Sequence, residues 1–241
     1  MSLIGKTVLI TGGVRRLGRS LALALAGKGA NLILHFSSSS DIAEQTQAEI
    51  KSLGVEAYIL QADFSDLSQT ADVISRAVEF SPLYALINNA AIFEDLQLHE
   101  TTLGDWNRHM SINLTSPFLL CQGFANSLLP NQEGRIVNIL DWRALRPGSS
   151  HLPYTVSKAA LAALTRSLAA SLAPQVTVNG LALGAILPPS DGGDTSHIVD
   201  KIPMQRWAKV NEVSDALLFL LDGPTYITGE IIHVDGGRHL I

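Results

Sequence analysis

Residues 7–18, TVLITGGVRRLG, decide the fold class of this 241-residue chain. The stretch begins with an almost continuous apolar run over residues 7–11, which is typical of a β-strand buried on both faces. Gly12 and Gly13 end the run, and helix-forming residues follow over 17–28. A second apolar run at 31–36 completes strand, helix and strand within about 30 residues, which is the size of a βαβ unit. We therefore expect two parallel strands joined by a helix.

The same alternation continues along the rest of the chain. Further strand-like runs lie at 55–61, 84–88, 135–140, 176–181 and 230–234, and helix-like segments lie at 41–53, 66–79, 104–129, 153–173 and 211–221. This order predicts a single doubly wound, Rossmann-like α/β domain over residues 1–241, with about seven parallel strands and helices on both faces. The longest irregular stretch, 187–207, predicts a loop that closes over a substrate.

Composition excludes several classes of function. A net charge of −5 leaves no basic field for nucleic acid. The lone Cys121 cannot form an intramolecular disulfide, and no Cys/His spacing resembles a metal site, so we expect a metal-free protein of a reducing, cytoplasmic compartment. No secretory signal is visible, and no apolar run approaches the roughly 20 residues of a membrane span. The low charged fraction, 16%, favours surface buried between subunits.

The turn after the first strand has the composition of a phosphate-binding site. Gly12 and Gly18 bracket Arg15 and Arg16 where a helix begins. Backbone N–H groups and the helix dipole at such a turn favour a pyrophosphate, and glycine permits its close approach. A tight strand-to-helix connection with no ligand is the alternative.

The end of the second strand favours a phosphorylated dinucleotide. An acidic residue roughly 20 positions past the glycines would bind a ribose 2′-hydroxyl. This chain has no such acid there; it has His35, Phe36, Ser37, Ser38 and Ser39, with Arg15 and Arg16 expected nearby. The pattern predicts NADPH rather than NADH. The alternative is that the serines form only a polar loop and a helix cap.

Tyr154 and Lys158 form a candidate catalytic pair. They are spaced i, i+4 at the start of an Ala/Leu-rich helix, which places them on one face. A nearby ammonium is expected to lower the pKa of the phenol and so to favour proton transfer. Such a pair arises often by accident, but this one follows Asp141, at the tip of a strand, by 13 residues.

Four ordered motifs resemble the short-chain dehydrogenase/reductase family over essentially the whole chain. The family pattern T-G-x-x-x-G-x-G corresponds to residues 11–18, and N-N-A-G corresponds to 88–91. The active-site asparagine corresponds to Asn113 in SINL, and Y-x-x-x-K to Tyr154 and Lys158. Asp63, in QADF, matches the acid that contacts adenine in this family.

Departures from the family pattern point to a subgroup. Arg16 replaces the middle glycine of the first motif, Ala91 the last glycine of the second, and Leu183 the proline after the sixth strand. Asp141 stands where most of the family has the catalytic serine. These departures, with Phe93 shortly after N-N-A and the ending VDGGRHL, are similar to pteridine reductases and bacterial dihydromonapterin reductases.

The motifs and the resemblance together imply the following site. Cofactor contacts are expected from Gly12, Arg15, Arg16, Leu17, Gly18, His35, Phe36, Ser37, Ser38, Ser39, Asp63, Phe64, Asn89, Ala90, Ala91, Ile139, Tyr154, Lys158, Gly184 and Ile186. Catalytic roles are expected for Asp141, Tyr154, Lys158 and Asn113, of which Lys158 also binds the nicotinamide ribose and Asn113 holds a water of the proton relay. No role is assigned to His151, Trp142, Arg143 or Trp207, although they can border the substrate.

A flat pterin explains the substrate residues Arg16, Phe93, Asp141 and Tyr154. Phe93 would stack on one face of the ring, and the planar fork of Arg16 would bridge cofactor phosphate and pterin edge. Asp141 would accept from pterin N–H groups and relay a proton with Tyr154. The plainer alternatives are a core phenylalanine, a purely phosphate-binding arginine, and an aspartate that caps a turn.

The resemblance therefore implies an NADPH-dependent reductase of a dihydropterin such as dihydromonapterin or dihydrobiopterin, and leaves dihydrofolate open. A ketone or 3-oxoacyl thioester reductase is the first alternative, although it would be expected to keep serine at 141 and glycine at 16. A non-catalytic NADPH-binding regulator is the second, although it would tolerate loss of Tyr154 or Lys158. Members of the family are usually homotetramers, and the apolar run at 159–164 suits a helix buried on several sides.

Overall fold

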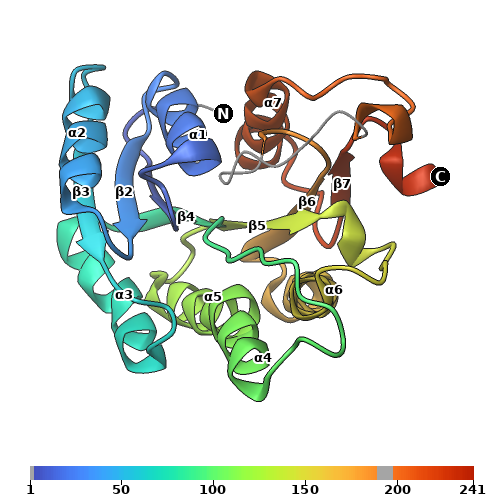
Figure 1. Cartoon of the computed structure of the whole chain (residues 1–241). Helices are drawn as coiled ribbons and strands as arrows, with labels where there is room; N and C mark the ends of the chain where they lie inside the picture. Colours follow the sequence, from blue (N-terminus) through green and yellow to red (C-terminus); the bar gives the residue numbers. More distant parts are fainter. Residues whose placement is uncertain (1–2, 189–197) are drawn as a thin grey trace.

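A computed structural model describes residues 3–188 and 198–241, and its centre is one parallel β-sheet (Figure 1). The strand order is β3-β2-β1-β4-β5-β6-β7, and every neighbouring pair is parallel. The strands are β1 (Thr7–Ile10), β2 (Asn31–Phe36), β3 (Ala57–Gln61), β4 (Leu83–Asn88), β5 (Gly134–Asp141), β6 (Val176–Leu183) and β7 (Ile231–Val234). The doubly wound fold predicted from the sequence is confirmed.

Helices cover both faces of the sheet. They are α1 (Arg16–Ala26), α2 (Ser40–Lys51), α3 (Leu67–Phe80), α4 (Leu103–Met110), α5 (Ser116–Ser127), α6 (Leu152–Leu172) and α7 (Val210–Asp222). Figure 1 shows α1, α2 and α7 on one face and α3, α4, α5 and α6 on the other. Within the described ranges, no helix combines the length and the apolar character that crossing a membrane requires.

Alternate residues of β1 supply the two halves of the core. Val8 and Ile10 pack in the cluster that includes α1 and α7, whereas Leu9 packs in the cluster that includes α3 and α5. All four residues of β1 are buried, because neither face of a parallel sheet covered by helices meets water. This double burial is the physical reason for the continuous apolar run in the sequence.

The strand order brings the carboxyl ends of β1, β4, β5 and β6 together at one edge of the sheet. The chain leaves β3 at one side and returns next to β1 as β4, so the direction of winding reverses between β1 and β4. Ligands of doubly wound folds bind outside the carboxyl ends of strands at such a reversal. Residues that follow these four strands are therefore candidates for one site.

The prediction of a single helix over 104–129 is wrong in one respect. A turn of π-helix, Ser111–Thr115, separates α4 from α5, and its fully buried residue is Asn113. A π-turn inserts a residue into the helical ladder and is frequent at functional sites. Apolar periodicity does not detect it, because the residues on either side of the turn are equally helix-compatible.

Gly18 allows α1 to start directly against the turn that follows β1. A Cβ atom at this position would lie 2.0 Å from the carbonyl oxygen of Gly12 and 2.8 Å from the Asn89 amide nitrogen. Both neighbours belong to closely packed loops, so a methyl group has no space unless the helix moves. Gly27, at the other end of α1, meets nothing closer than 3.4 Å.

We predict that Gly18→Ala lowers the free energy of unfolding by about 2 kcal/mol or more, because overpacking displaces α1 from the turn. Gly27→Ala is the matched control and should be neutral or stabilising by about 0.5 kcal/mol, because it removes freedom from the unfolded chain without a clash. Urea unfolding followed by circular dichroism measures both values. Equal free energies of unfolding of the two variants would contradict the close approach of Gly18 to Gly12.

Candidate active site

His35 holds the glycine-rich turn in place. The Gly12 N–H donates to His35 Nδ1 at 3.1 Å, and His35 Nε2 lies 3.0 Å from the carbonyl oxygen of Ala62. The imidazole also stacks on the Phe64 ring with 3.9 Å between centroids. Nδ1 therefore accepts and Nε2 donates, which ties the end of β1 to the loop after β3.

The His35 imidazole is neutral at physiological pH. Its pKa is lowered from 6.5 to about 4, mainly by burial, which outweighs the opposing hydrogen bond to Ala62; the smaller effects of Arg76 and Asp63 lower and raise it, respectively. Both ring nitrogens of His35 have protein partners, and the cofactor contact expected of this residue stays a prediction. His35 thus acts on the site through the position of Gly12 and contributes no positive charge.

A cavity at the start of α1 joins most of the residues expected to bind a cofactor. Its lining consists of Gly12, Arg15, Arg16, Leu17, Gly18, His35, Ser37, Asn89, Ala90 and Ala91. Arg15 and Arg16 are exposed at its mouth, and the Arg15 guanidinium donates to the Ser39 hydroxyl. This pairing places a cation beside the polar end of β2, where a 2′-phosphate would be bound.

The remaining residues of the expected cofactor site differ in exposure. Phe36 is buried in the core and Phe64 under His35, so neither side chain is free for a ligand. Ser38 is exposed, as is Asp63, whose carboxylate accepts from the Ser65 N–H at 2.9 Å. The cofactor contacts expected of Phe36 and Phe64 stay predictions.

Thr11 joins the loop after β1 to the loop after β4, where the direction of winding reverses. This role was not predicted from the sequence. Its hydroxyl oxygen accepts from the N–H groups of Asn89 and Ala90, each at 2.9 Å, and donates to the carbonyl of Ile87 at 3.3 Å. The Asn89 amide donates in return to the Thr11 carbonyl at 2.8 Å. The signal in the sequence that could have revealed this role is a hydroxyl residue at the end of an apolar strand.

Asp141, Tyr154 and Lys158 lie together in the floor of a second cavity. The Tyr154 hydroxyl donates to Asp141 Oδ2 at 3.2 Å, and Lys158 Nζ donates to the Ile139 carbonyl at 2.7 Å. Asp141 Oδ1 accepts from the Arg143 N–H at 2.8 Å and from its guanidinium at 3.3 Å. The carboxylate is thus both a turn cap and part of the site, so the two interpretations offered for it are compatible.

The electrostatics of Tyr154 differ from the expectation. Burial raises the pKa of the phenol well above its usual value, and the charge of Asp141 raises it further, while Arg143 opposes this. The prediction of a lowered pKa is therefore wrong for the protein alone, because burial and the Asp141 carboxylate both raise the pKa of the phenol. Tyr154 stays protonated and can act as a proton donor.

Lys158 is a fully enclosed ammonium. Burial lowers its pKa from 10.5 to about 8, and the charge of Asp141 partly offsets this effect. Its nitrogen lies 5.8 Å from the centre of the Tyr154 ring. A positive charge at this distance stabilises negative charge that develops on the phenol when its proton leaves.

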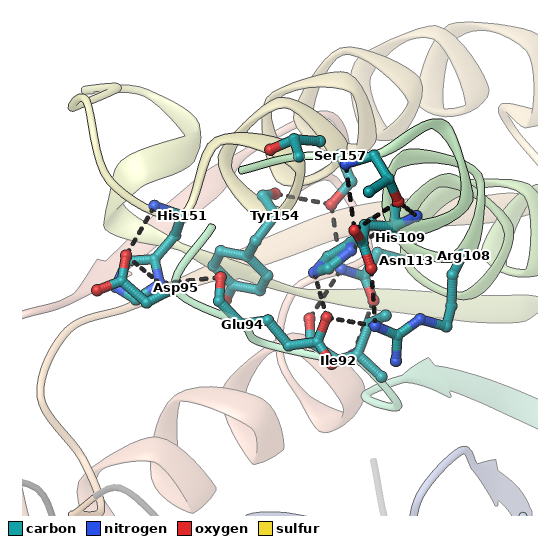
Figure 2. A network of polar contacts seen from close by, with 12 residues as sticks. Ile92, Glu94, Asp95, Arg108, His109, Asn113, His151, Tyr154 and Ser157 are labelled. Carbon is teal, nitrogen blue, oxygen red and sulfur yellow. Dashed lines mark hydrogen bonds and ion pairs between the residues drawn. The ribbon is translucent and has the colours of Figure 1, made fainter. Parts of the chain in front are cut away.

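Asn113 braces the segment that carries Phe93 (Figure 2). Its amide accepts from the Ile92 N–H at 2.9 Å and donates to the Ile92 carbonyl at 3.0 Å. It also donates to Ser157 Oγ at 3.1 Å, on the helix of Tyr154. The π-turn thereby connects the Phe93 segment to α6, and the water contact expected of Asn113 stays a prediction.

Phe93 forms one wall of the site and is held from two sides. It is half-exposed, stacks on His151 at 4.2 Å and meets the Tyr154 ring edge-on at 4.7 Å. Next to it, Glu94 accepts from the Arg108 guanidinium at 2.6 Å, and the Glu94 carbonyl lies 3.1 Å from His151 Nδ1 (Figure 2). His151, which had no assigned role, is the support behind the Phe93 ring.

Two adjoining hollows share five lining residues, Phe93, Asp141, Tyr154, Gly184 and Leu187. The inner one is also lined by Arg16, Leu17, Asn89, Ala91, Ile139, Leu140, Lys158, Leu183 and Ile186. The outer one is also lined by Trp142, Arg143, Ala185, Ile198, Trp207 and Arg238. Residues 189–197 of the predicted closing loop lie outside the described residues, but both ends of that loop border the outer hollow.

The comparisons with known proteins identify the family. A family model described as enoyl-(acyl carrier protein) reductase matches residues 13–239. The 3-oxoacyl-[acyl-carrier-protein] reductase of Synechocystis sp. is 32% identical over 241 residues, which cover 98% of each chain. The chain belongs to the short-chain dehydrogenase/reductase family and is an oxidoreductase.

Solved structures similar to this chain contain a nicotinamide cofactor. FolM alternative dihydrofolate reductase 1 of Brucella canis, complexed with NADP, superposes with a TM-score of 0.92 at 32% identity, over 100% of this chain and 97% of that one. A blue fluorescent protein from a metagenomic library, in complex with NADPH, gives 0.92 at 32% identity over 99% of both chains.

We predict that His35 makes stability fall in acid. Its pKa is about 4 when folded and 6.5 ordinarily, so between these values the unfolded chain binds a proton that the folded protein does not. The contribution of the neutral imidazole to the free energy of unfolding is present above pH 6.5 and is lost as pH falls. The loss is about 2 kcal/mol between pH 7 and pH 5.

Urea unfolding of wild type and His35→Gln at both pH values measures this contribution. The variant should be less stable at pH 7 and should lose less stability on acidification. His99→Gln, at an exposed histidine, is the control and should retain the wild-type dependence. An unchanged acid dependence in His35→Gln would rule out the buried neutral imidazole.

Proposed function

We propose that this oxidoreductase is an NADPH-dependent reductase that converts a dihydropterin to the tetrahydropterin. The observation that carries the proposal is Asp141, whose carboxylate reaches Tyr154 at 3.2 Å in the floor of the cleft beside the aromatic wall of Phe93. The proposal includes dihydromonapterin-, dihydrobiopterin- and dihydrofolate-like substrates. The dihydrofolate reductase named among the similar structures supports it.

The cleft fits a phosphorylated dinucleotide. Because Gly18 has no Cβ atom, the start of α1 lies directly against Gly12, and both residues line the cavity in which the N–H groups of the helix start favour a pyrophosphate. Arg15 and Ser39 offer donors to a 2′-phosphate, and Asn89 and Lys158 line the path to the inner hollow. Bound NADPH would supply a hydride to a substrate in the inner hollow.

Asp141 explains why a pterin suits this site better than a ketone. Reduction of a ketone builds negative charge on oxygen, which a carboxylate at hydrogen-bonding distance opposes. A pterin instead presents N–H donors, which a carboxylate accepts. Among these substrates, the N5=C6 bond of a 7,8-dihydropterin takes the hydride at carbon and a proton at nitrogen, so no oxyanion forms.

Tyr154 and Lys158 provide the proton in this proposal. The raised pKa of Tyr154 keeps its proton in place until the ring nitrogen becomes basic after hydride addition. Lys158 then offsets the negative charge left on the phenol, and Asn113 holds the water through which that proton is replaced. The Phe93 ring covers one face of the substrate, and Arg16, which lines both the cofactor cavity and the inner hollow, bridges the two ligands.

Reduction of a 3-oxoacyl thioester is the second candidate. It is favoured by the similarity to 3-oxoacyl-[acyl-carrier-protein] reductases, one of which covers 98% of this chain. The charge of Asp141 disfavours it, because reduction of a ketone builds negative charge on oxygen. The two activities share the cofactor, Tyr154 and Lys158, so substrate choice alone separates them.

We also propose a homo-oligomer of the family's usual tetrameric kind. Phe118 on α5 is 39% exposed, and Ala163 on α6 is exposed within an apolar run. A second copy of the chain packed on α4, α5 and α6 would cover these groups. Light scattering should give a mass well above 25.8 kDa, and a monomer at micromolar concentration would contradict the proposal.

For the function, we predict that wild-type protein consumes NADPH with 7,8-dihydrobiopterin and much more slowly with an acetoacetyl thioester. Tyr154→Phe should lower kcat at least about 100-fold, because general acid catalysis is lost. Asp141→Ser should lower kcat/KM for the pterin by roughly 100-fold, because it loses a charged hydrogen bond to substrate and the proton relay. Absorbance of NADPH follows each reaction.

Asp215→Ser is the matched control, since Asp215 is exposed on α7, and it should leave both rates unchanged. Turnover of the thioester alone would reject the pterin proposal in favour of the second candidate. Binding of NADPH without turnover of either substrate would indicate a regulator. Full pterin activity in Asp141→Ser would refute the role of the carboxylate.

A further inference from the structure

The outer hollow contains a cation that the proposed chemistry does not use. Arg238 lines it together with Trp142, Arg143 and Trp207. The Arg238 guanidinium lies 4.6 Å from the centre of the Trp142 ring, and Arg143 lies 4.9 Å from the same ring. One indole therefore holds two guanidinium groups at the outer end of the substrate space.

The two arginines differ in their partners. Arg143 is neutralised by Asp141, with 3.3 Å between the charged atoms. Arg238 has no ion pair with any carboxylate of residues 3–188 and 198–241, and Asp235, its neighbour in the turn, binds His239 instead at 2.8 Å. The outer hollow thus has one unneutralised positive charge among its described residues.

The backbone fixes Arg238 in this position. Gly236 and Gly237 have φ values of 65° and 86°, which turn the chain after β7 into the short 3-10 helix Arg238–Leu240. Asp235 accepts from the N–H groups of Gly237 and His239, each at 2.9 Å. The backbone from which Arg238 projects is therefore capped, and its guanidinium packs over the Trp142 ring.

The surroundings of Arg238 make an incoming anion favourable. Burial lowers the pKa of this guanidinium and the charge of Arg143 lowers it further, and these two effects outweigh the opposing charges of Asp141 and Asp235. An anion in the outer hollow would relieve both effects. A guanidinium also binds carboxylate or phosphate through two parallel hydrogen bonds.

We propose that Arg238 is a specificity-determining residue that binds an anionic group on the substrate's side chain, while the ring of the substrate occupies the space beside Phe93 and Asp141. This inference rests on the proposed dihydropterin reductase and names the subclass of dihydropterin: one whose side chain ends in a carboxylate or a phosphate. Trp142 and Trp207 provide the apolar walls between ring and anion.

The test compares substrates with and without the anion. 7,8-Dihydroneopterin and its monophosphate differ only in a phosphate, and 7,8-dihydrofolate carries carboxylates. Arg238→Gln should raise KM about tenfold for an anionic substrate and less than twofold for 7,8-dihydroneopterin, with kcat unchanged. The KM of Arg238→Lys for the anionic substrate should lie between those of wild type and Arg238→Gln, because lysine keeps the charge and loses the planar fork.

Added salt should raise KM for the anionic substrate in wild type and much less in Arg238→Gln, because screening acts only where the charge is present. Lys28→Gln, at an exposed lysine in the turn after α1, is the control for the change in charge and should match wild type. The phosphate and the carboxylate substrates show which anion is preferred.

An equal change in KM for neutral and anionic substrates, or no change for either anion, would overturn the role of Arg238. Consumption of no pterin at all by wild type would overturn the proposed function instead. The two failures are therefore distinguishable.

Discussion

The close approach of three backbones at the carboxyl ends of β1 and β4 is the constraint on which the site depends. Gly18 lets α1 begin against Gly12, Thr11 binds the loop of Asn89, and His35 holds Gly12 from the opposite side. None of these contacts involves a catalytic side chain. They set the position of the anion-binding end, and the end of β5 and the first turn of α6 bring Asp141 and Tyr154 into the adjoining hollow.

Charge at the other end of the cleft is balanced locally. Asp141 accepts from Arg143 and from Tyr154, so one carboxylate neutralises a cation and adds to the burial that already keeps the phenol protonated. A serine at this position would supply neither the neutralising charge nor the added effect on the phenol. The same ion pair leaves Arg238 as the positive charge of the outer hollow, so the proposed preference for an anionic side chain follows from the same residue as the preference for a pterin ring.

The support of Phe93 shows how a substrate wall is built from residues far apart in the chain. Asn113 fixes the backbone just before Phe93, and His151 stacks on its outer face. The π-turn exists at the point where Asn113 reaches this segment. The wall therefore depends on α4, α5 and α6 together, and a ring that is half-exposed is nevertheless held in one orientation.

The sequence by itself determined the alternating elements, the parallel sheet and the motifs that line the cleft, because burial on both faces and glycine-rich turns leave local patterns. It could not determine the direction of the pKa shift of Tyr154, since burial and the contact with Asp141 raise this pKa although Lys158 is the helical neighbour. Nor could it show that His35 faces inward or that Arg238 lies over Trp142. Those facts depend on through-space distances and burial, which only the packing of distant segments decides.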